Sequence, residues 1–252
     1  MEIKGCVAIV TGGNRGIGEA FVRALVKADA RRIYVGSRDE KNAGHLVAEA
    51  PDRVAAVRLD VSKVETIEAA AKKCEDVSVV INNAGAFHNR RLIAAPDISA
   101  ARDEMEVNYF GLLNMCRAFA PILKANGGGA IVNVLSAGGI VAAPVMGGYS
   151  PSKFAARAAT TCIRAELAAQ HTQVSALIVG SVDTRMASHV EGAKERPEDI
   201  AGIGLTAIKR NIDEIDTDRM AVEVRANLAR DPKGLERAMA RMLDVAAIST
   251  GR

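Results

Sequence analysis

A tyrosine and a lysine stand four residues apart at Tyr149 and Lys153, and Ser136 precedes the tyrosine by thirteen positions. If residues 150–169 form a helix, Tyr149 and Lys153 lie one turn apart on the same face. A phenol ordinarily titrates near about pH 10, so it can act as an acid or base at neutral pH only if a neighbouring cation stabilises its anion. The spacing therefore indicates proton transfer by Tyr149, although a half-buried tyrosine beside a solvated lysine would give the same pattern.

A glycine-rich segment near the N-terminus could hold a phosphate. The apolar run 7–11 predicts a buried strand of a parallel sheet, and Gly12, Gly16 and Gly18 follow it, before a helical pattern over 19–28. Glycines at such a turn let the backbone approach a ligand and aim the free N–H groups of the helix at a phosphate. The spacing departs from G-x-G-x-x-G, so an ordinary tight turn is the alternative interpretation.

The second predicted strand spans residues 32–36, and the residues directly after it would determine which dinucleotide the protein prefers. This strand ends in Ser37, Arg38 and Asp39. An acidic residue here accepts from the ribose 2′-hydroxyl of NAD, whereas an arginine accommodates the 2′-phosphate of NADP. Arg15, in the glycine turn, is a second cation that could reach this phosphate. Two guanidiniums favour a dianionic phosphate, so we expect NADP(H) in preference to NAD(H), unless Asp39 turns inward to a 2′-hydroxyl.

Polar or small residues also follow the remaining predicted strands. The strands are 54–59, 77–81, 130–135 and 174–179, and the segments after them are Asp60-Val61, Asn82 to Gly85, Ser136 and Gly180 to Thr184. Ligands gather at the carboxyl ends of the strands in an open parallel sheet, so we expect these segments to face one site. Asp60 could contact an adenine or cap the helix that follows it. Asn108, inside a helical pattern over 99–125, either faces solvent or has a functional reason to be there.

Short apolar strands alternating with helical patterns predict a Rossmann-type, doubly wound parallel α/β fold. We expect a single domain over residues 1–252. Its dinucleotide-binding and catalytic core would span 1–184, and a substrate loop and C-terminal helices would span 185–252. After the core, a short run at 211–216 could be a last strand, and helical patterns at 219–230 and 233–245 close the chain.

Composition excludes several classes of protein. Hydrophobic residues make up 49% and charged residues 25% of the 252 residues, and the net charge of +3 includes no long basic run, so neither nucleic acid nor a membrane surface is indicated as a partner. No apolar run approaches the roughly 20 residues of a membrane span, which favours a cytoplasmic protein. Cys6, Cys74, Cys116 and Cys162 are widely spaced in apolar segments. We expect them to be reduced and buried, and we expect no metal site.

Taken together, the motifs resemble those of the short-chain dehydrogenase/reductase family over at least residues 5–184. They are Thr11-Gly12-x-x-x-Gly16-x-Gly18, Asp60, Asn82-Asn83-Ala84-Gly85, Asn108, Ser136 and Tyr149-x-x-x-Lys153. Each motif is weak alone, but their order and separations are specific. The pairs Asn14-Arg15 and Ser37-Arg38 also resemble those of the NADP-preferring carbonyl reductases in that family.

The resemblance implies a catalytic tetrad of Asn108, Ser136, Tyr149 and Lys153. Tyr149 would give its proton to a carbonyl oxygen while hydride passes from NADPH to the carbonyl carbon, and Ser136 would hydrogen-bond that oxygen. Lys153 would bind the nicotinamide ribose and favour the tyrosinate. Asn108 would support a water that relays protons toward Lys153.

The resemblance also implies which residues hold the cofactor. The glycine turn would surround the pyrophosphate and a ribose, the end of the third strand would meet the adenine, and the segment after the sixth strand would meet the nicotinamide. The full set is Gly12, Asn14, Arg15, Gly16, Ile17, Gly18, Ser37, Arg38, Asp60, Val61, Asn83, Ala84, Gly85, Tyr149, Lys153, Val182 and Thr184. Two departures are Val179-Gly180, where the family often has Pro-Gly, and the lack of the glycine-rich terminal signature that helps build its tetramers. A homodimer is compatible with this pattern.

We therefore expect an NADPH-dependent oxidoreductase that reduces a ketone or aldehyde to an alcohol, or catalyses the reverse reaction. A 3-oxoacyl thioester reductase is a second enzymatic interpretation. A non-catalytic NADP(H)-sensing regulator is a third, against which the complete tetrad argues. We expect the pocket walls to come from Phe87, His88, 140–146 and 186–195, and the substrate to be largely apolar. His88 and His189 could each be pocket donors or exposed loop residues.

Overall fold

A parallel sheet organises the protein. The structure is a computed structural model that describes residues 1–188 and 190–244. Within these residues, a seven-stranded sheet has the order β3-β2-β1-β4-β5-β6-β7, with every neighbouring pair parallel. The strands are β1 (Val7–Thr11), β2 (Arg32–Ser37), β3 (Val54–Arg58), β4 (Val79–Asn82), β5 (Gly129–Val134), β6 (Thr172–Ile178) and β7 (Glu214–Asp216). The predicted doubly wound α/β fold is confirmed.

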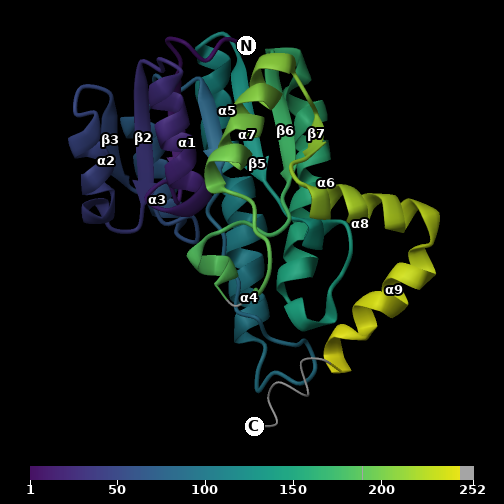
Figure 1. Ribbon diagram of the computed structural model, residues 1–252. Coiled ribbons are helices and arrows are strands. Elements are labelled where there is room, and N and C mark those ends of the chain that lie inside the picture. The colour runs from purple at the N-terminus through teal and green to yellow at the C-terminus, as the bar shows by residue number, and fades with distance from the viewer. Residues whose placement is uncertain (189, 245–252) are drawn as a thin grey trace.

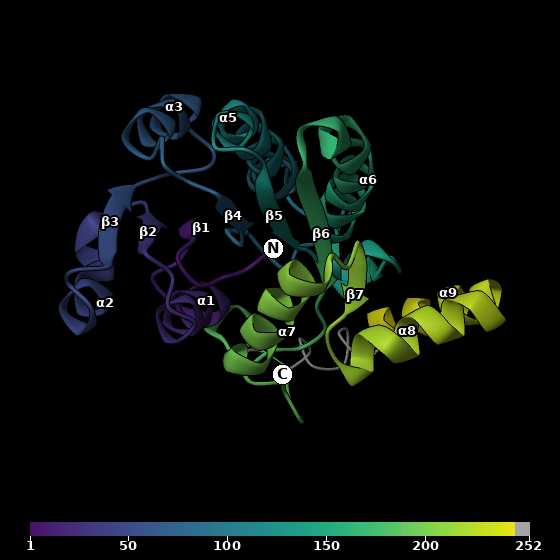
Figure 2. The same ribbon diagram turned by 90° about the horizontal axis from the view of Figure 1, so that it is seen from above.

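Helices cover both faces of the sheet, as Figure 2 shows along its edge. One face carries α1 (Gly16–Lys27), α2 (Gly44–Glu49) and α7 (Pro197–Arg210), and the other carries α3 (Val64–Lys73), α5 (Leu112–Ala125) and α6 (Tyr149–Leu167). In β1, Ala8 and Val10 belong to the first core and Val7 and Ile9 to the second. Because both faces are buried, the strand is apolar throughout instead of alternating.

The helical pattern over 99–125 forms three pieces. These are α4 (Ser99–Met105), the π-helical segment η2 (Glu106–Gly111) and α5. Such π-helical turns are frequent at functional sites. At its end, Gly111 packs so closely on Val61 that a Cβ would lie 2.9 Å from the Val61 carbonyl oxygen. The sequence predicted one continuous helix here, and this close approach to the segment after β3 accompanies the change in helical geometry.

Short 3-10 segments complete the connections. They are η1 (Glu40–Ala43), η3 (Ala137–Gly139), η4 (Pro144–Met146), η5 (Ala168–Gln170) and η6 (Arg185–Ala187). The predicted elements are present with shifted ends. The first helix, predicted over 19–28, begins at Gly16 directly after the glycine turn, and the run 211–216 contributes only its last three residues to β7.

Beyond β7, α8 (Arg219–Arg230) and α9 (Pro232–Ala240) project from the body of the protein (Figure 1). Asp218 caps α8 by accepting from the N–H of Ala221, and Asp231 caps α9 by accepting from the N–H of Gly234. The last helix was predicted to reach Val245; α9 ends at Ala240, and Val245 lies outside the described residues.

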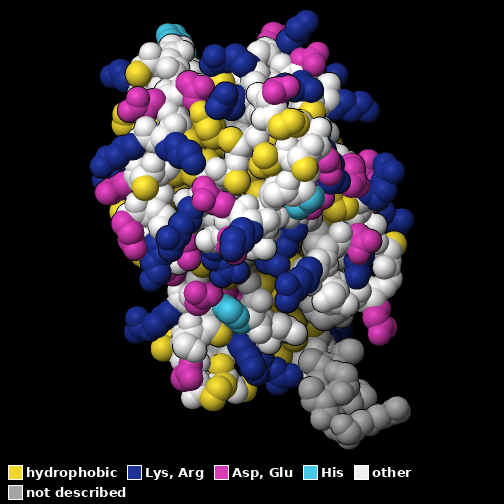
Figure 3. Space-filling model, turned by 90° about the vertical axis from the view of Figure 1, so that its left-hand side faces the viewer, with side chains coloured by type: hydrophobic (Ala, Val, Ile, Leu, Met, Phe, Trp, Pro, Cys, Tyr) yellow, Lys and Arg dark blue, Asp and Glu magenta, His cyan; other side chains and the backbone are white. Residues whose placement is uncertain are grey.

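Charged side chains of both signs share the surface (Figure 3), and the cysteines lie at different depths. Lys and Arg side chains are interspersed with Asp and Glu on the face shown in Figure 3. In residues 1–188 and 190–244, no helix has the length and apolar character needed to cross a bilayer. Cys6, Cys74 and Cys116 are buried as predicted, but Cys162 is exposed. The buried face of α6 contains Thr160 and Ile163, and Cys162 points away from it.

Candidate functional site

A cleft of about 820 Å³ opens at the carboxyl edge of the sheet. Its volume is within the range of small-molecule and cofactor sites. All but one of the residues predicted to hold a cofactor line it: Gly12, Asn14, Arg15, Gly16, Ile17, Ser37, Arg38, Asp60, Val61, Asn83, Ala84, Gly85, Tyr149, Lys153, Val182 and Thr184. The parallel strands thus bring together segments that are distant in the sequence.

Gly18 is the exception. A Cβ at Gly18 would lie 2.5 Å from Asn83 Nδ2 and would collide with the carbonyl oxygen of Gly12. Its lack of a side chain lets α1 pack against the glycine turn, and the contact of Gly18 with a ligand stays a prediction. Asn83 Nδ2 donates to the carbonyl oxygens of Thr11 at 3.0 Å and Gly12 at 3.2 Å. The end of β4 is thereby fixed to this turn.

The glycine turn leads into the N-terminus of α1. Gly12 and Gly16 have φ angles of 59° and 55°, a region that glycine adopts without steric cost. Arg15 is the N-cap residue in an extended conformation, and no side chain caps the helix. Because Gly16 and Ile17 line the cleft, unpaired N–H groups of this first turn are available to a phosphate.

Two exposed arginines, Arg15 and Arg38, line the same end of the cleft. Neither guanidinium has an ion-pair partner within the part of the chain that the structure describes. Asp39 was the alternative candidate for binding a ribose 2′-hydroxyl. It accepts from the N–H of Lys41 at 3.0 Å and does not line the cleft. Asn42 does line it and was not predicted, since nothing in its spacing from β2 marks it. This end of the cleft is therefore cationic.

Asp60 both caps a turn and lines the cleft, so it combines the two positions that its sequence context allowed. Its Oδ1 accepts from the N–H and the hydroxyl of Ser62, at 3.1 and 2.7 Å, so it caps the turn that leads toward α3. It also lines the cleft, beside Val61. The N-cap residue of α3 itself is Lys63.

Tyr149, Lys153 and Ser136 meet at the other end of the cleft. Tyr149 is the first residue of α6, and Lys153 Nζ lies 5.7 Å from the centre of its ring. The side chain of Ser136 is close enough to the phenol to lower the pKa of Tyr149. Lys153 is 5% exposed, and its Nζ donates to the carbonyl oxygen of Val134 at 3.0 Å. The predicted one-turn spacing thus places a phenol, a hydroxyl and an ammonium together.

Burial dominates the acidity of these groups. It raises the pKa of Tyr149, which the side chain of Ser136 lowers and the negative charge of Glu104 raises further. It also lowers the pKa of Lys153 to about 8. The expectation that Lys153 makes Tyr149 more acidic is therefore not met within the chain's own residues, where the ammonium is hydrogen-bonded to Val134.

Asn108 lies behind the cleft and is 2% exposed. Its Oδ1 accepts from the N–H of Ala86, and its Nδ2 donates to the Ala86 carbonyl oxygen and to Ser152 Oγ, each at 2.9 Å. Asn108 thus joins the segment after β4 to α6, and the solvent-facing interpretation is wrong.

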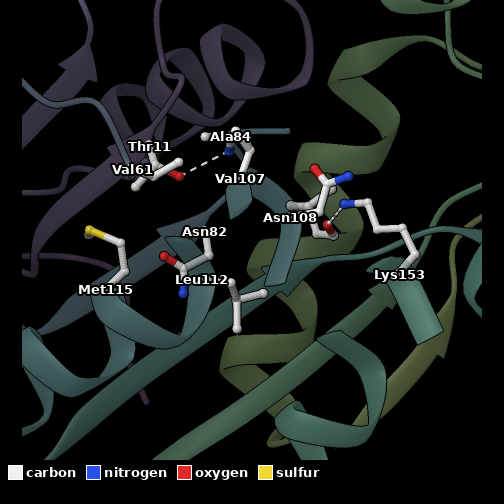
Figure 4. Close-up of a pocket in the computed structure, with 10 residues that line it drawn as sticks. Thr11, Val61, Asn82, Ala84, Val107, Asn108, Leu112, Met115 and Lys153 are labelled. Carbon is white, nitrogen blue, oxygen red and sulfur yellow. Dashed lines mark hydrogen bonds between the residues drawn. The ribbon is translucent and has the colours of Figure 1, made fainter. Parts of the chain in front are cut away.

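A small cavity of about 10 Å³ lies between Asn108 and Lys153 on one side and Asn82 on the other (Figure 4). This is close to the smallest volume that holds one water molecule. Asn82 lines the cavity, and its Oδ1 is buried without a hydrogen-bond partner in the described chain. A polar cavity with an unsatisfied oxygen is suited to one bound water.

The walls near Tyr149 differ in part from the prediction. Phe87 and His88 line the cleft, and the Phe87 ring packs edge-on against Tyr149 with centroids 5.1 Å apart. Of the predicted loop 186–195, Met186 and Ala187 line the cleft, and His189 lies outside the described residues. None of residues 140–146 lines it. Ile140 is 4% exposed and is packed in the core, which removes it from the wall.

The family model described as short chain dehydrogenase matches residues 6–195. The chain belongs to the short-chain dehydrogenase family. The relatives that it resembles include proteins named as dehydrogenases, among them a galactitol 2-dehydrogenase.

Known relatives differ in how much of their length they share with this short-chain dehydrogenase. It is 41% identical to the short chain dehydrogenase from Burkholderia cenocepacia J2315 solved in complex with NADP, with a TM-score of 0.90 over 95% of this chain and 99% of that one. It is 34% identical to galactitol 2-dehydrogenase (L-tagatose-forming) from Cereibacter sphaeroides, over 78% of each protein. The match to dehydrogenase/reductase SDR family member 7B from Danio rerio is 31% identical and covers 73% of this chain but 63% of that protein.

Proposed function

We propose that this short-chain dehydrogenase is an NADPH-dependent reductase of ketones or aldehydes, or catalyses the reverse oxidation, with Tyr149 as the acid or base. The observation that carries the proposal is the layout of one cleft. Tyr149, Ser136 and Lys153 lie at one end, and the glycine turn with Arg15 and Arg38 lies at the other. A dinucleotide that spans the cleft would supply a hydride next to the phenol.

The reaction needs a proton at the carbonyl oxygen as negative charge develops there. Tyr149 donates that proton, and Ser136 donates a hydrogen bond to the same oxygen, which stabilises the transition state more than the ground state. In the complex with the cofactor, Lys153 holds a ribose hydroxyl and, as a cation, eases the loss of the phenol proton, an effect that is absent among the chain's own residues. Asn108 fixes the segment after β4, and a water in the cavity beside it would return protons toward Lys153.

The preference for NADP(H) is proposed from charge. Arg15 and Arg38 are exposed, line the cleft and have no ion-pair partner in the described chain. A dianionic 2′-phosphate would satisfy both guanidiniums, whereas a 2′-hydroxyl would satisfy neither fully. The relative from Burkholderia cenocepacia, which was solved with NADP, supports the same choice.

The substrate class is proposed from the wall around Tyr149. Phe87, Met186 and Ala187 supply apolar surface there, beside a few polar groups such as His88. Pockets of this composition bind largely apolar molecules and orient them with few hydrogen bonds.

A panel of ketones, aldehydes and 3-oxoacyl thioesters, with the absorbance of reduced nicotinamide as the readout, tests the proposal. We expect turnover of apolar carbonyls with a higher kcat/KM for NADPH than for NADH. Faster turnover of the thioesters would favour the 3-oxoacyl reductase instead. Stoichiometric NADPH binding without turnover of any compound would favour a dinucleotide-sensing regulator and contradict the proposal.

A further inference from the structure

A buried carboxylate lies beside the site without lining the cleft. Glu104 belongs to α4 and is 1% exposed. Its Oε1 accepts from the backbone N–H of His88 at 2.7 Å. Its Oε2 is buried and has no hydrogen-bond partner in residues 1–188 and 190–244. Buried carboxylates are normally paired with a cation or fully hydrogen-bonded, so Glu104 requires an explanation.

The unpartnered oxygen faces the start of α6. A Cβ added to Gly148, the residue before Tyr149, would lie 2.6 Å from Glu104 Oε2 and 2.5 Å from the Cα of Ala101. Glycine at this position therefore allows α4 to pack directly against the first turn of α6. Helix N-termini favour negative charge because their first N–H groups have no partner within the helix. The carboxylate thus lies at the end of α6 that carries the phenol.

No cation neutralises this carboxylate within the described chain. The imidazole of His88 contacts Asp103 instead, with Nε2 and Oδ2 2.6 Å apart. Burial raises the pKa of Glu104; the backbone N–H and the charge of His88 lower it in part, and the charge of Asp103 raises it. A neutral amide of the same shape would avoid the cost of burying this charge. No ion pair in the described residues offsets this cost, and the charge lies near the phenol.

We propose that Glu104 is a positioning residue, which fastens the loop carrying Phe87 and His88 to α4 and keeps a negative charge beside the first turn of α6, where Tyr149 lies. This inference rests on the proposed reductase function. The pKa of Tyr149 is raised mainly by burial, and the negative charge of Glu104 adds to this by opposing loss of the phenol proton. Tyr149 is thereby kept in the protonated form that a carbonyl reductase requires.

The other charged groups around Tyr149 come from several elements. Lys153 lies one turn along α6, and the His88 and Asp103 pair lies between the loop and α4. A substitution at Glu104 leaves all of these in place, so a change in the titration of Tyr149 reports the charge of Glu104.

A spectroscopic titration tests the inference without activity. The chain has three tyrosines, and the difference in phenolate absorbance between a protein and its Tyr149→Phe version isolates Tyr149. Glu104→Gln keeps an oxygen for the His88 N–H and removes the charge. The matched control Glu106→Gln makes the same chemical change two residues away, outside the cleft lining.

We expect Glu104→Gln to move the ionisation of Tyr149 to lower pH and to melt at or above the temperature of the parent at pH 7, whereas Glu106→Gln leaves the titration unchanged. An unshifted titration in Glu104→Gln would overturn the inference. So would failure of this variant to fold, because the carboxylate would then serve the fold.

Kinetics separate the effect of the Glu104 charge on Tyr149 from the effect of its hydrogen bond to the His88 N–H. In carbonyl reduction, Glu104→Gln should shift the basic limb of kcat/KM to lower pH at unchanged KM. Glu104→Ala, which also removes the acceptor for His88, should raise KM. An unmoved basic limb, or equal KM values for the two variants, would overturn the inference. A parent without reductase activity would refute the proposed function alone, because the titration still tests Glu104.

Discussion

Two clusters of charged and polar side chains in this protein are partly or fully buried, and they are built in opposite ways. Near β7, Arg157 and Arg225 form paired hydrogen bonds with the carboxylates of Glu214 and Asp216, at N···O distances of 2.6 to 2.9 Å. Around Tyr149, Lys153 donates to a carbonyl oxygen and Glu104 has an unpartnered oxygen. The first cluster matches every charge with its opposite, and the second does not.

The acidities follow this difference. Burial alone would raise the pKa of Glu214, but hydrogen bonds from Arg157 and Arg225 lower it, and the bond to Asp216 raises the pKa of Arg225. In the site, burial raises the pKa of Tyr149 and lowers that of Lys153, so burial shifts each group toward its neutral form. The paired cluster stabilises the fold. The site keeps groups that can exchange protons, at some cost in stability.

Lys153→Met should sharpen the comparison most. We expect loss of carbonyl reduction by roughly 100-fold or more, since the cation that assists Tyr149 is gone. The pKa of Lys153 is about 8 in the folded chain and 10.5 ordinarily. Between these two pH values Lys153 is protonated in the unfolded chain but neutral in the folded chain. The free energy of unfolding of the parent therefore rises with pH in this range, and that of Lys153→Met lacks this rise.

Melting temperatures of the parent and Lys153→Met across this pH range, with the exposed Lys209→Met as the control, provide the measurement. Parallel curves for the parent and Lys153→Met would show that Lys153 does not titrate between the two values.

Arg15→Ser and Arg38→Ser should affect only the cofactor. Each removes one charge-assisted contact with a 2′-phosphate, so we expect KM for NADPH to rise about 10- to 100-fold and KM for NADH to change little. Steady-state kinetics with both cofactors checks this. Equal losses with NADPH and NADH would mean that the arginines serve the pyrophosphate or the fold.

Arg225→Met should have the smallest effect on chemistry. It leaves Glu214 with one guanidinium and Asp216 with none, which should cost about 1 to 2 kcal/mol, and it should leave kcat/KM near that of the parent. Thermal unfolding measures the cost, and Arg219→Met, whose pair with Glu223 is exposed on the same helix, is the control. A variant as stable as the control would show that the β7 cluster is not stabilising.

The sequence predicted the parts of the site that follow from strand ends. Apolar runs located β1, β2 and β5, and the parallel sheet then brought Gly12, Arg38 and Ser136 to one edge. The spacing of Tyr149 and Lys153 was sufficient to place both on one face of α6. These features depend on local pattern and on the general geometry of parallel sheets.

Other features depend on tertiary contacts that no local pattern encodes. Asn108, in the π-helical turn, is buried and hydrogen-bonded to Ala86 and Ser152, which come from distant segments. Glu104 reads as an ordinary helical surface residue, and its burial follows from the glycine at Gly148. The removal of 140–146 from the wall likewise follows from how Ile140 packs in the core.

The central claim is that Tyr149 passes the proton as hydride moves. The most direct measurement is kcat/KM for NADPH-dependent carbonyl reduction by Tyr149→Phe, with NADPH affinity determined on the same sample and Tyr109→Phe, outside the cleft, as the control. We predict a loss of roughly 100- to 10,000-fold at nearly unchanged NADPH affinity, and a control equal to the parent. A Tyr149→Phe protein that reduces the same carbonyl as fast as the parent would contradict the account.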